Sequence, residues 1–237
     1  MTVEILYSEV CNLFGDIGNV RYLEKSLPDS KFIYTRLGDK PYFADNKVNL
    51  IYLGSMSESV QELVIKELEP YKSKISDMIS DGTAFIITGS AVDIFGKSIV
   101  DTDSGEALKG LGIVNMKVTR DMNHRYSGFV LAERDSLEFV GFQAQFTQSE
   151  VENSEQRFLT VKKGRGMNES SDYEGIKINN FYATNLLGPF LLVNPLFSKK
   201  LLSDISGKEI ITAFENEAIE AYKKRVEDFK NPSIKVH

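Results

Sequence analysis

The stretch that decides the fold is Ala84-Phe85-Ile86-Ile87-Thr88, which runs directly into Gly89-Ser90-Ala91. A short, apolar run followed by small residues predicts a strand buried on both faces that turns sharply into a helix. The run at residues 49–53 ends in Gly54-Ser55-Met56 and predicts a second strand and turn of the same kind. Because ligands bind at the carboxyl ends of strands in open α/β sheets, we expect both turns to line one crevice.

Strands and helices alternate through the first half of the chain. Residues 3–7 and 31–37 are typical of strands, and residues 16–27 between them have the apolar spacing of a helix. Ser59 and Glu62 match a capping box at the start of a further helix. The apolar positions expected on that helix are Val60, Leu63, Val64 and Leu68. This alternation predicts a mainly parallel sheet covered on both faces, with a short helix through Phe95 after the Gly89 turn.

The second half of the chain has a different pattern, with strand-like pieces and no convincing helix between residues 112 and 187. The expected strands lie at residues 128–132, 137–142, 158–162 and 181–187, and they extend the parallel core into a mixed sheet. Residues 209–230 predict a long amphipathic helix. Its apolar stripe comprises Ile210, Phe214, Ala218, Tyr222 and Phe229, and packing against the sheet explains it better than docking to a partner. No linker or composition break divides residues 1–237, so one domain is expected.

Composition excludes several classes of function. The formal charge of −6 does not provide the basic surface that nucleic-acid binding requires. The first residues lack the basic region of a signal peptide, and no apolar run reaches the length of a membrane span, so a cytoplasmic protein is expected. A single cysteine, Cys11, fits a reducing compartment. With only His124 and His237 beside it, a Cys/His zinc site is excluded, and we expect neither a metal nor a cofactor.

Two glycine-containing segments imitate phosphate-binding loops. Gly96-Lys97-Ser98 has Ala91 where the motif requires a glycine, and it follows a helix rather than opening one. Gly164-Arg165-Gly166 lacks the third glycine of a dinucleotide fingerprint and is typical of a turn. Neither segment predicts a nucleotide site.

Several segments, in their order and spacing, resemble a known family over nearly the whole chain. They are Asn12-Leu13-Phe14-Gly15-Asp16-Ile17-Gly18-Asn19, Ile51-Tyr52-Leu53-Gly54-Ser55-Met56 with Gln61, residues 89–96, Gly110-Leu111-Gly112-Ile113, Gly141-Phe142-Gln143 and Asn185-Leu186-Leu187-Gly188-Pro189-Phe190-Leu191. Together these segments resemble class I glutamine amidotransferases of the CobB/CobQ type, most closely the GatD subunits of lipid II isoglutaminyl synthases. The resemblance implies a three-layer, flavodoxin-like α/β domain.

The resemblance also implies a mechanism whose residues are missing here. In the family a cysteine at the strand-to-helix turn attacks the amide of glutamine, and a histidine activates it. The matching positions are Gly89 and Leu192, and the glutamine implied to hold the substrate matches Asp93. The family's Glu-Asn-His segment matches Gln143-Ala144-Gln145, which removes another histidine. Gly89, Asp93 and Leu192 are therefore predicted to be vestigial, and no catalytic residue is assigned.

Other residues of the crevice are candidates for binding a ligand. They are Asp16, Gly54, Ser55, Met56, Ser90, Arg125, Gln143 and Gln145. Asp16 alternatively caps a helix, and Arg125 is balanced between a surface cation and a residue that contacts a ligand or partner. Ser90 is not favoured as a nucleophile because no base accompanies it. Cys11 is expected to be a packed thiol and His124 a surface residue.

The favoured hypothesis is a protein of this family that has lost glutaminase activity and acts by binding. The resemblance implies a Mur-ligase-like synthetase as its partner, and a small carboxylate or amide as its ligand. The alternative is an active amidotransferase or hydrolase of altered chemistry that recruits Ser90, Asp93, Asp16 or Arg125.

Overall fold

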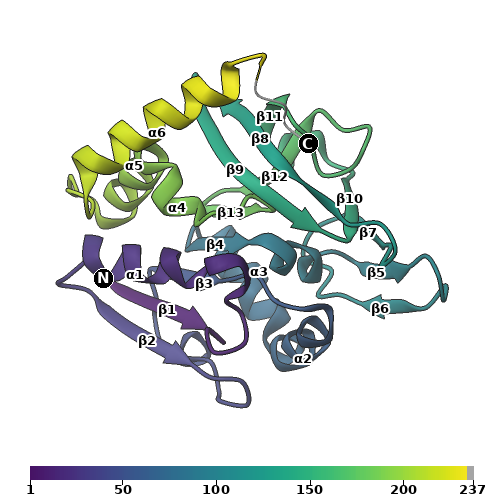
Figure 1. Cartoon of the computed structure of the whole chain (residues 1–237). Helices are drawn as coiled ribbons and strands as arrows, with labels where there is room; N and C mark the ends of the chain where they lie inside the picture. Colours follow the sequence, from purple (N-terminus) through teal and green to yellow (C-terminus); the bar gives the residue numbers. More distant parts are fainter. Residues whose placement is uncertain (234–237) are drawn as a thin grey trace.

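The computed structural model describes residues 1–233, and a nine-stranded mixed sheet forms its centre (Figure 1). The strand order is β2-β1-β3-β4-β13-β12-β11-β8-β9. The strands are β1 (Thr2–Leu6), β2 (Lys31–Thr35), β3 (Leu50–Leu53), β4 (Ala84–Thr88), β8 (Tyr126–Arg134), β9 (Leu137–Gln145), β11 (Arg157–Lys163), β12 (Tyr173–Ile178) and β13 (Phe181–Thr184). Neighbours from β2 to β13 pair in parallel and the remainder are antiparallel, as the change of sequence pattern predicted.

A second, four-stranded sheet has the order β10-β7-β5-β6. Its strands are β5 (Ser98–Asp101), β6 (Ala107–Lys109), β7 (Met116–Arg120) and β10 (Thr147–Val151). Strand β10 follows β9 almost directly, and this places Thr147 beside the main sheet.

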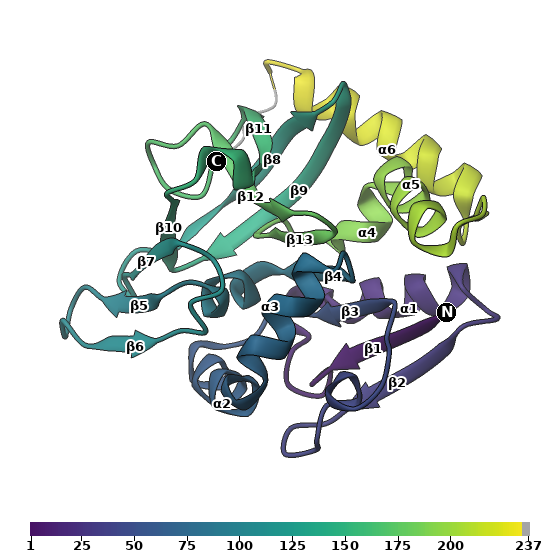
Figure 2. The same cartoon turned by 180° about the vertical axis from the view of Figure 1, so that it is seen from behind.

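Helices cover both faces of the main sheet, because successive strand residues point to opposite sides. Ile51 and Leu53 pack with the helices α2 (Glu58–Leu68) and α3 (Lys72–Ser80), which the reverse view shows (Figure 2). Leu50 and Tyr52 pack on the other face with α1 (Ile17–Ser26), α4 (Phe190–Val193) and α5 (Pro195–Ser206). Helix α6 (Glu215–Lys230) lies against β8 and β9. The result is the three-layer mixed α/β fold that the sequence predicted.

Some predicted boundaries were wrong. The C-terminal helix begins at Glu215 and not at residue 209, because Phe214 adopts a left-handed conformation with φ of 53° and its side chain faces solvent. Ile210 is buried, but in the preceding loop. Tyr222 and Phe229 of the stripe do pack on Leu131 and Val140 of the sheet, as expected, and Ala218 is buried.

Two further corrections concern the first half and the end of the sheet. Helix α2 begins after Ser57, so Ser59 and Glu62 form no capping box, and the Ser59 hydroxyl lies 3.1 Å from that of Ser57. Leu63 is exposed because it lies on the solvent side of α2. Strand β13 ends at Thr184, and Leu187 forms only an isolated bridge with Phe142.

Candidate functional site

A cavity of about 250 Å³ opens at the carboxyl ends of the parallel strands. Three of its walls are loops that follow strands: Leu13 and Phe14 after β1, Met56 after β3, and Ser90 after β4. Parallel strands bring these loops to one edge of the sheet, where ligands bind in such folds. The opposite wall includes Arg125 and the junction between β9 and β10.

Gly89 forms the sharp turn between β4 and the 3₁₀ helix Gly89–Phe95, with a φ of 59°. This left-handed conformation is disfavoured for residues that carry a Cβ atom. A Cβ atom on Gly89 would lie 2.6 Å from Ser55 Oγ, 2.7 Å from Ser55 Cβ and 2.9 Å from Leu187 Cδ2. The turn is therefore shaped like one that presents a nucleophile, but neighbouring side chains fill the space of that nucleophile.

Ser90 is held by the loop after β3. Its hydroxyl donates to the Met56 carbonyl at 2.5 Å and accepts from the Met56 amide at 3.0 Å. The Gln61 side chain donates to the Ser90 carbonyl at 2.6 Å. A nucleophilic serine must give its proton to a base, whereas this hydroxyl gives it to a peptide carbonyl. No histidine lines the cavity within the described part of the chain.

Two backbone amides of the loop after β3, which contacts Gly89, are also engaged. The Ser55 amide donates to Asp16 Oδ2 at 2.7 Å, and the Met56 amide donates to the Ser90 hydroxyl. Stabilising a developing oxyanion requires amide donors aimed at the reacting oxygen. These two donors are directed at side chains of the protein instead.

Asp16 is the centre of a buried network that joins three strand ends. Its carboxylate accepts from Thr88 Oγ1 at 2.5 Å and from Asn19 Nδ2 at 2.9 Å, in addition to the Ser55 amide. The Tyr52 hydroxyl lies 3.1 Å from Thr88 Oγ1 and donates to the Asp16 carbonyl. Asp16 precedes α1, but its side chain makes no capping bond. Burial raises the pKa of Asp16, and these hydrogen bonds oppose that rise.

Asp93 lies in the floor of the cavity and is completely buried. It accepts from Thr147 Oγ1 at 3.0 Å, Gln61 Nε2 at 3.3 Å and Ser149 Oγ at 3.4 Å. Burial raises the pKa of Asp93 to about 6, against the opposing effect of these donors and of Arg120. Arg120 donates to the Gln61 side chain. Sequence reasoning did not identify Arg120 or Thr147, because both come from the second sheet.

Arg125 lies at the mouth of the cavity. Its guanidinium lies 5.4 Å from the Phe14 ring centre and 5.8 Å from that of Phe146. Within residues 1–233 no carboxylate forms an ion pair with it. Arg125 is therefore a solvent-accessible cation that lies against two aromatic rings and forms no ion pair with a described carboxylate.

Gln145 also lines the cavity, whereas Gln143 is not one of the lining residues. Gln145 donates to the Thr147 carbonyl at 2.9 Å, and its buried Oε1 has no hydrogen-bond partner. Gln143 donates to the Gly166 carbonyl at 3.4 Å. Gln145 therefore provides an unused acceptor at this wall.

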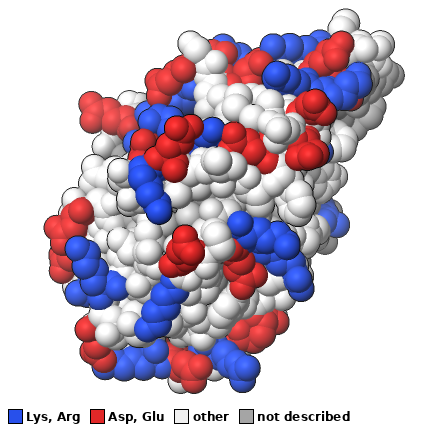
Figure 3. Space-filling view, turned by 90° about the vertical axis from the view of Figure 1, so that its left-hand side faces the viewer, with Lys and Arg blue, Asp and Glu red and all other residues white. Residues whose placement is uncertain are grey.

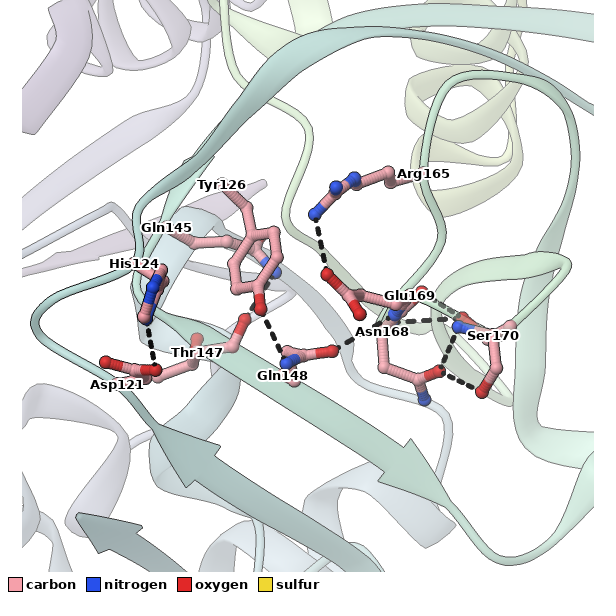
Figure 4. A network of polar contacts seen from close by, with 11 residues as sticks. Asp121, His124, Tyr126, Gln145, Thr147, Gln148, Arg165, Asn168, Glu169 and Ser170 are labelled. Carbon is pink, nitrogen blue, oxygen red and sulfur yellow. Dashed lines mark hydrogen bonds and ion pairs between the residues drawn. The ribbon is translucent and has the colours of Figure 1, made fainter. Parts of the chain in front are cut away.

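A polar network on the outer side of β8 and β10 includes His124 (Figure 4). Nδ1 of His124 lies 2.7 Å from Asp121 Oδ2, and the histidine side chain is 74% exposed. Separately from His124, the Gln148 side chain donates to the Tyr126 hydroxyl at 2.7 Å and accepts from the Glu169 amide at 3.1 Å. His124 is thus a surface residue that is paired with Asp121, and it does not line the cavity. The second histidine, His237, lies outside the described residues.

Leu192 lies on α4 and is half-buried, where it packs against the apolar cluster beneath α1 and α5. It is not part of the cavity wall. Cys11 is also buried, and burial raises the pKa of its thiol to about 12. The cavity therefore contains neither an imidazole nor a thiol among its described residues.

The model of the CobB/CobQ-like glutamine amidotransferase domain matches residues 2–195 of the chain. The chain belongs to this family. Among curated proteins, this amidotransferase-family chain is similar to the lipid II isoglutaminyl synthase (glutamine-hydrolyzing) subunit GatD of Staphylococcus aureus strain N315. The two are 26% identical over 197 residues, and the match covers 82% of this chain and 79% of that protein. This chain is 22% identical over 215 residues to the subunit of the same name from Streptococcus pneumoniae strain ATCC BAA-255 / R6, covering 86% and 79%.

A crystal structure of a glutamine amidotransferase has the same fold as this amidotransferase-family chain. The two superpose with a TM-score of 0.52 at 12% identity, over 86% of this chain and 98% of the other. This similarity identifies the class I, flavodoxin-like fold. Within the described residues, no helix combines the length and apolar character needed to cross a membrane.

Proposed function

We propose that this chain is an amidotransferase-family protein that does not hydrolyse glutamine and acts by binding. The observation that carries the proposal is Gly89, because the turn keeps its left-handed conformation while Ser55 and Leu187 occupy the space of a side chain. Leu192, which the resemblance matches to the family's histidine, packs in an apolar cluster, and the apolar side chain beside Gly89 is that of Leu187. A glutamine amide placed in this crevice would therefore meet neither a nucleophile nor a base.

The cavity is suited to a small carboxylate or amide. Arg125 offers a charged donor for a carboxylate, since none of the described acidic residues, the cavity's Glu58 and Asp93 included, forms an ion pair with it. Gln145 Oε1 offers an acceptor for an amide N–H, although a ligand must first gain access to this buried atom. Pairing it would relieve the free-energy cost of a buried polar atom without a partner.

The relatives support a partner protein for this chain. Both GatD proteins are named as subunits of a lipid II isoglutaminyl synthase, and the chain covers most of their length. A Mur-ligase-like synthetase is therefore the partner we propose. One face of the molecule carries acidic and basic side chains interspersed rather than one large basic patch, which suits a protein partner better than a nucleic acid (Figure 3).

Altered chemistry at Ser90 is not favoured. The Ser90 hydroxyl is fixed between the amide and the carbonyl of Met56, and releasing it would leave both groups without this partner. Asp16 is equally engaged, with donors from Ser55, Thr88 and Asn19.

A thermal-shift screen with glutamine, glutamate and small acids tests the binding proposal. A ligand that binds only the folded state raises the melting temperature, and the rise should disappear in an Arg125→Gln variant. Arg36→Gln is the matched control, because Arg36 is an exposed arginine beyond β2 and is not among the residues that line the cavity. If no acid or amide raises the melting temperature, or if both variants respond equally, the cavity does not bind through Arg125.

A further inference from the structure

A second pocket, of about 210 Å³, lies between α5 and the end of the sheet opposite the crevice. Leu137 and Phe139 at the start of β9 contribute to it, whereas Gln145 at the far end of β9 lines the crevice. Gln145 lies eight positions after Leu137, which corresponds to roughly 27 Å along a strand. The two sites are therefore separate.

The walls of this pocket are aromatic. Phe158, Tyr182 and Phe197 lie with their ring centres 5.3 to 5.9 Å apart. Phe139 lies 5.5 Å from Phe158 and 5.3 Å from Phe197. Such walls favour an apolar body, most of all a flat one that can pack on the rings.

The mouth of the pocket carries charges of both signs. Asp135 Oδ2 lies 3.6 Å from Arg134 Nε, and Asp204 Oδ2 lies 2.8 Å from Lys200 Nζ. Lys177 is the remaining charged residue of the lining, and no carboxylate in residues 1–233 forms an ion pair with it. Each carboxylate at the mouth is thus paired with one cation, and the lining carries a net positive charge of one, at Lys177.

Lys177 is held above the aromatic wall. Its ammonium lies 5.4 Å from the Tyr182 ring centre and donates to the Asn179 carbonyl at 2.9 Å. Burial lowers the pKa of Lys177, the positive charge of Arg134 lowers it further, and the negative charge of Asp135 opposes both. An anion placed between Lys177 and Arg134 would relieve their repulsion and compensate for the lost hydration.

We propose that this pocket binds a small amphipathic carboxylate, an aromatic or short-chain apolar acid. Its carboxylate pairs with Lys177 at the mouth, and its apolar body packs on the wall that Phe158, Tyr182 and Phe197 form. The volume is below that of sites for drug-sized ligands, so the apolar body is limited to about one ring or a short chain. This site does not depend on the crevice or on the proposal made for it.

Titration of the protein with phenylacetate, followed by ligand-observed NMR, tests this proposal. Phenylacetamide has the same shape without the charge, and acetate has the charge without the apolar body. We expect phenylacetate to bind about tenfold more tightly than either control. Equal binding of phenylacetate and phenylacetamide would contradict a role for the cation, and equal binding of acetate would contradict a role for the aromatic walls.

Variants locate the binding. Lys177→Gln should weaken phenylacetate binding about tenfold, since one charge-assisted contact is removed. Leu137→Trp should abolish binding by filling the pocket from its half-buried edge. Lys66→Gln, on the remote helix α2, and Arg125→Gln, in the crevice, should leave binding unchanged. An unchanged affinity in Lys177→Gln, or a loss in Arg125→Gln, would overturn the assignment to this pocket.

Discussion

Replacing Gly89 by cysteine tests whether the nucleophile position is filled. The new Cβ atom would lie within 2.9 Å of Ser55 Oγ, Ser55 Cβ and Leu187 Cδ2, closer than real Cβ contacts. The left-handed conformation costs about 1–2 kcal/mol for a residue with a side chain, and overpacking a well-packed site costs about 1–3 kcal/mol more. We therefore expect Gly89→Cys to lower the free energy of unfolding by about 2–5 kcal/mol, measured by equilibrium urea denaturation.

A second glycine separates the two contributions. Gly38 has a φ of 88° and no heavy atom within 4 Å of an added Cβ. Gly38→Cys should therefore show only the conformational cost of about 1–2 kcal/mol. Adding Ser55→Gly to Gly89→Cys removes the nearest two clashing atoms and should recover part of the loss. If Gly89→Cys were no less stable than Gly38→Cys, the space beside Gly89 would be open and the reasoning refuted.

Three further predictions concern buried groups. Asp16→Ala should lower the free energy of unfolding by about 3 kcal/mol or more, because the Ser55, Thr88 and Asn19 donors lose their acceptor, at about 1–3 kcal/mol each. Asp29→Ala, at an exposed position, should change the free energy of unfolding little, and equal effects of the two substitutions would contradict the network. Burial raises the pKa of Asp93 in the folded state from 3.8 to about 6, so between these pH values the folded state binds a proton that the unfolded state does not. The free energy of unfolding, compared with that of Asp93→Asn, should therefore fall as the pH rises from about 4 to 6. If this difference in free energy stayed flat or rose with pH, the pKa would not be raised. Cys11, with a pKa raised to about 12, should react with a thiol reagent only after unfolding in urea, and rapid labelling of the folded protein would contradict its burial.

The parallel core could be predicted from the sequence because its strands are short apolar runs. Strand β4 can be predicted from its own residues alone, since Phe85, Ile86 and Ile87 are buried on both faces of the sheet. The second sheet was missed because its strands are short and half-exposed, so their pattern is weak. Helix α5 was missed although Pro195 at its start and Gly207 at its end are ordinary helix signals.

The crevice itself could be predicted, but not the contacts that fill it. Residues after β3 and β4 were expected to meet, because parallel strands end at one edge. The bonds between Ser90 and Met56, 34 residues apart, depend on the register of β3 and β4 and on the left-handed turn at Gly89. A sequence pattern does not specify these details. For the same reason, the second pocket was not predicted, since its walls come from α5 and five strands.

Ammonia release from glutamine is the most direct test of the central claim. The purified chain should release no more ammonia than a heat-denatured sample, alone or with a Mur-ligase-like synthetase that itself lacks glutaminase activity. A glutamine analogue that alkylates catalytic nucleophiles should likewise leave the mass of the folded chain unchanged. Turnover of glutamine that is abolished by Ser90→Ala, or covalent labelling at the crevice, would show that this protein is an active enzyme.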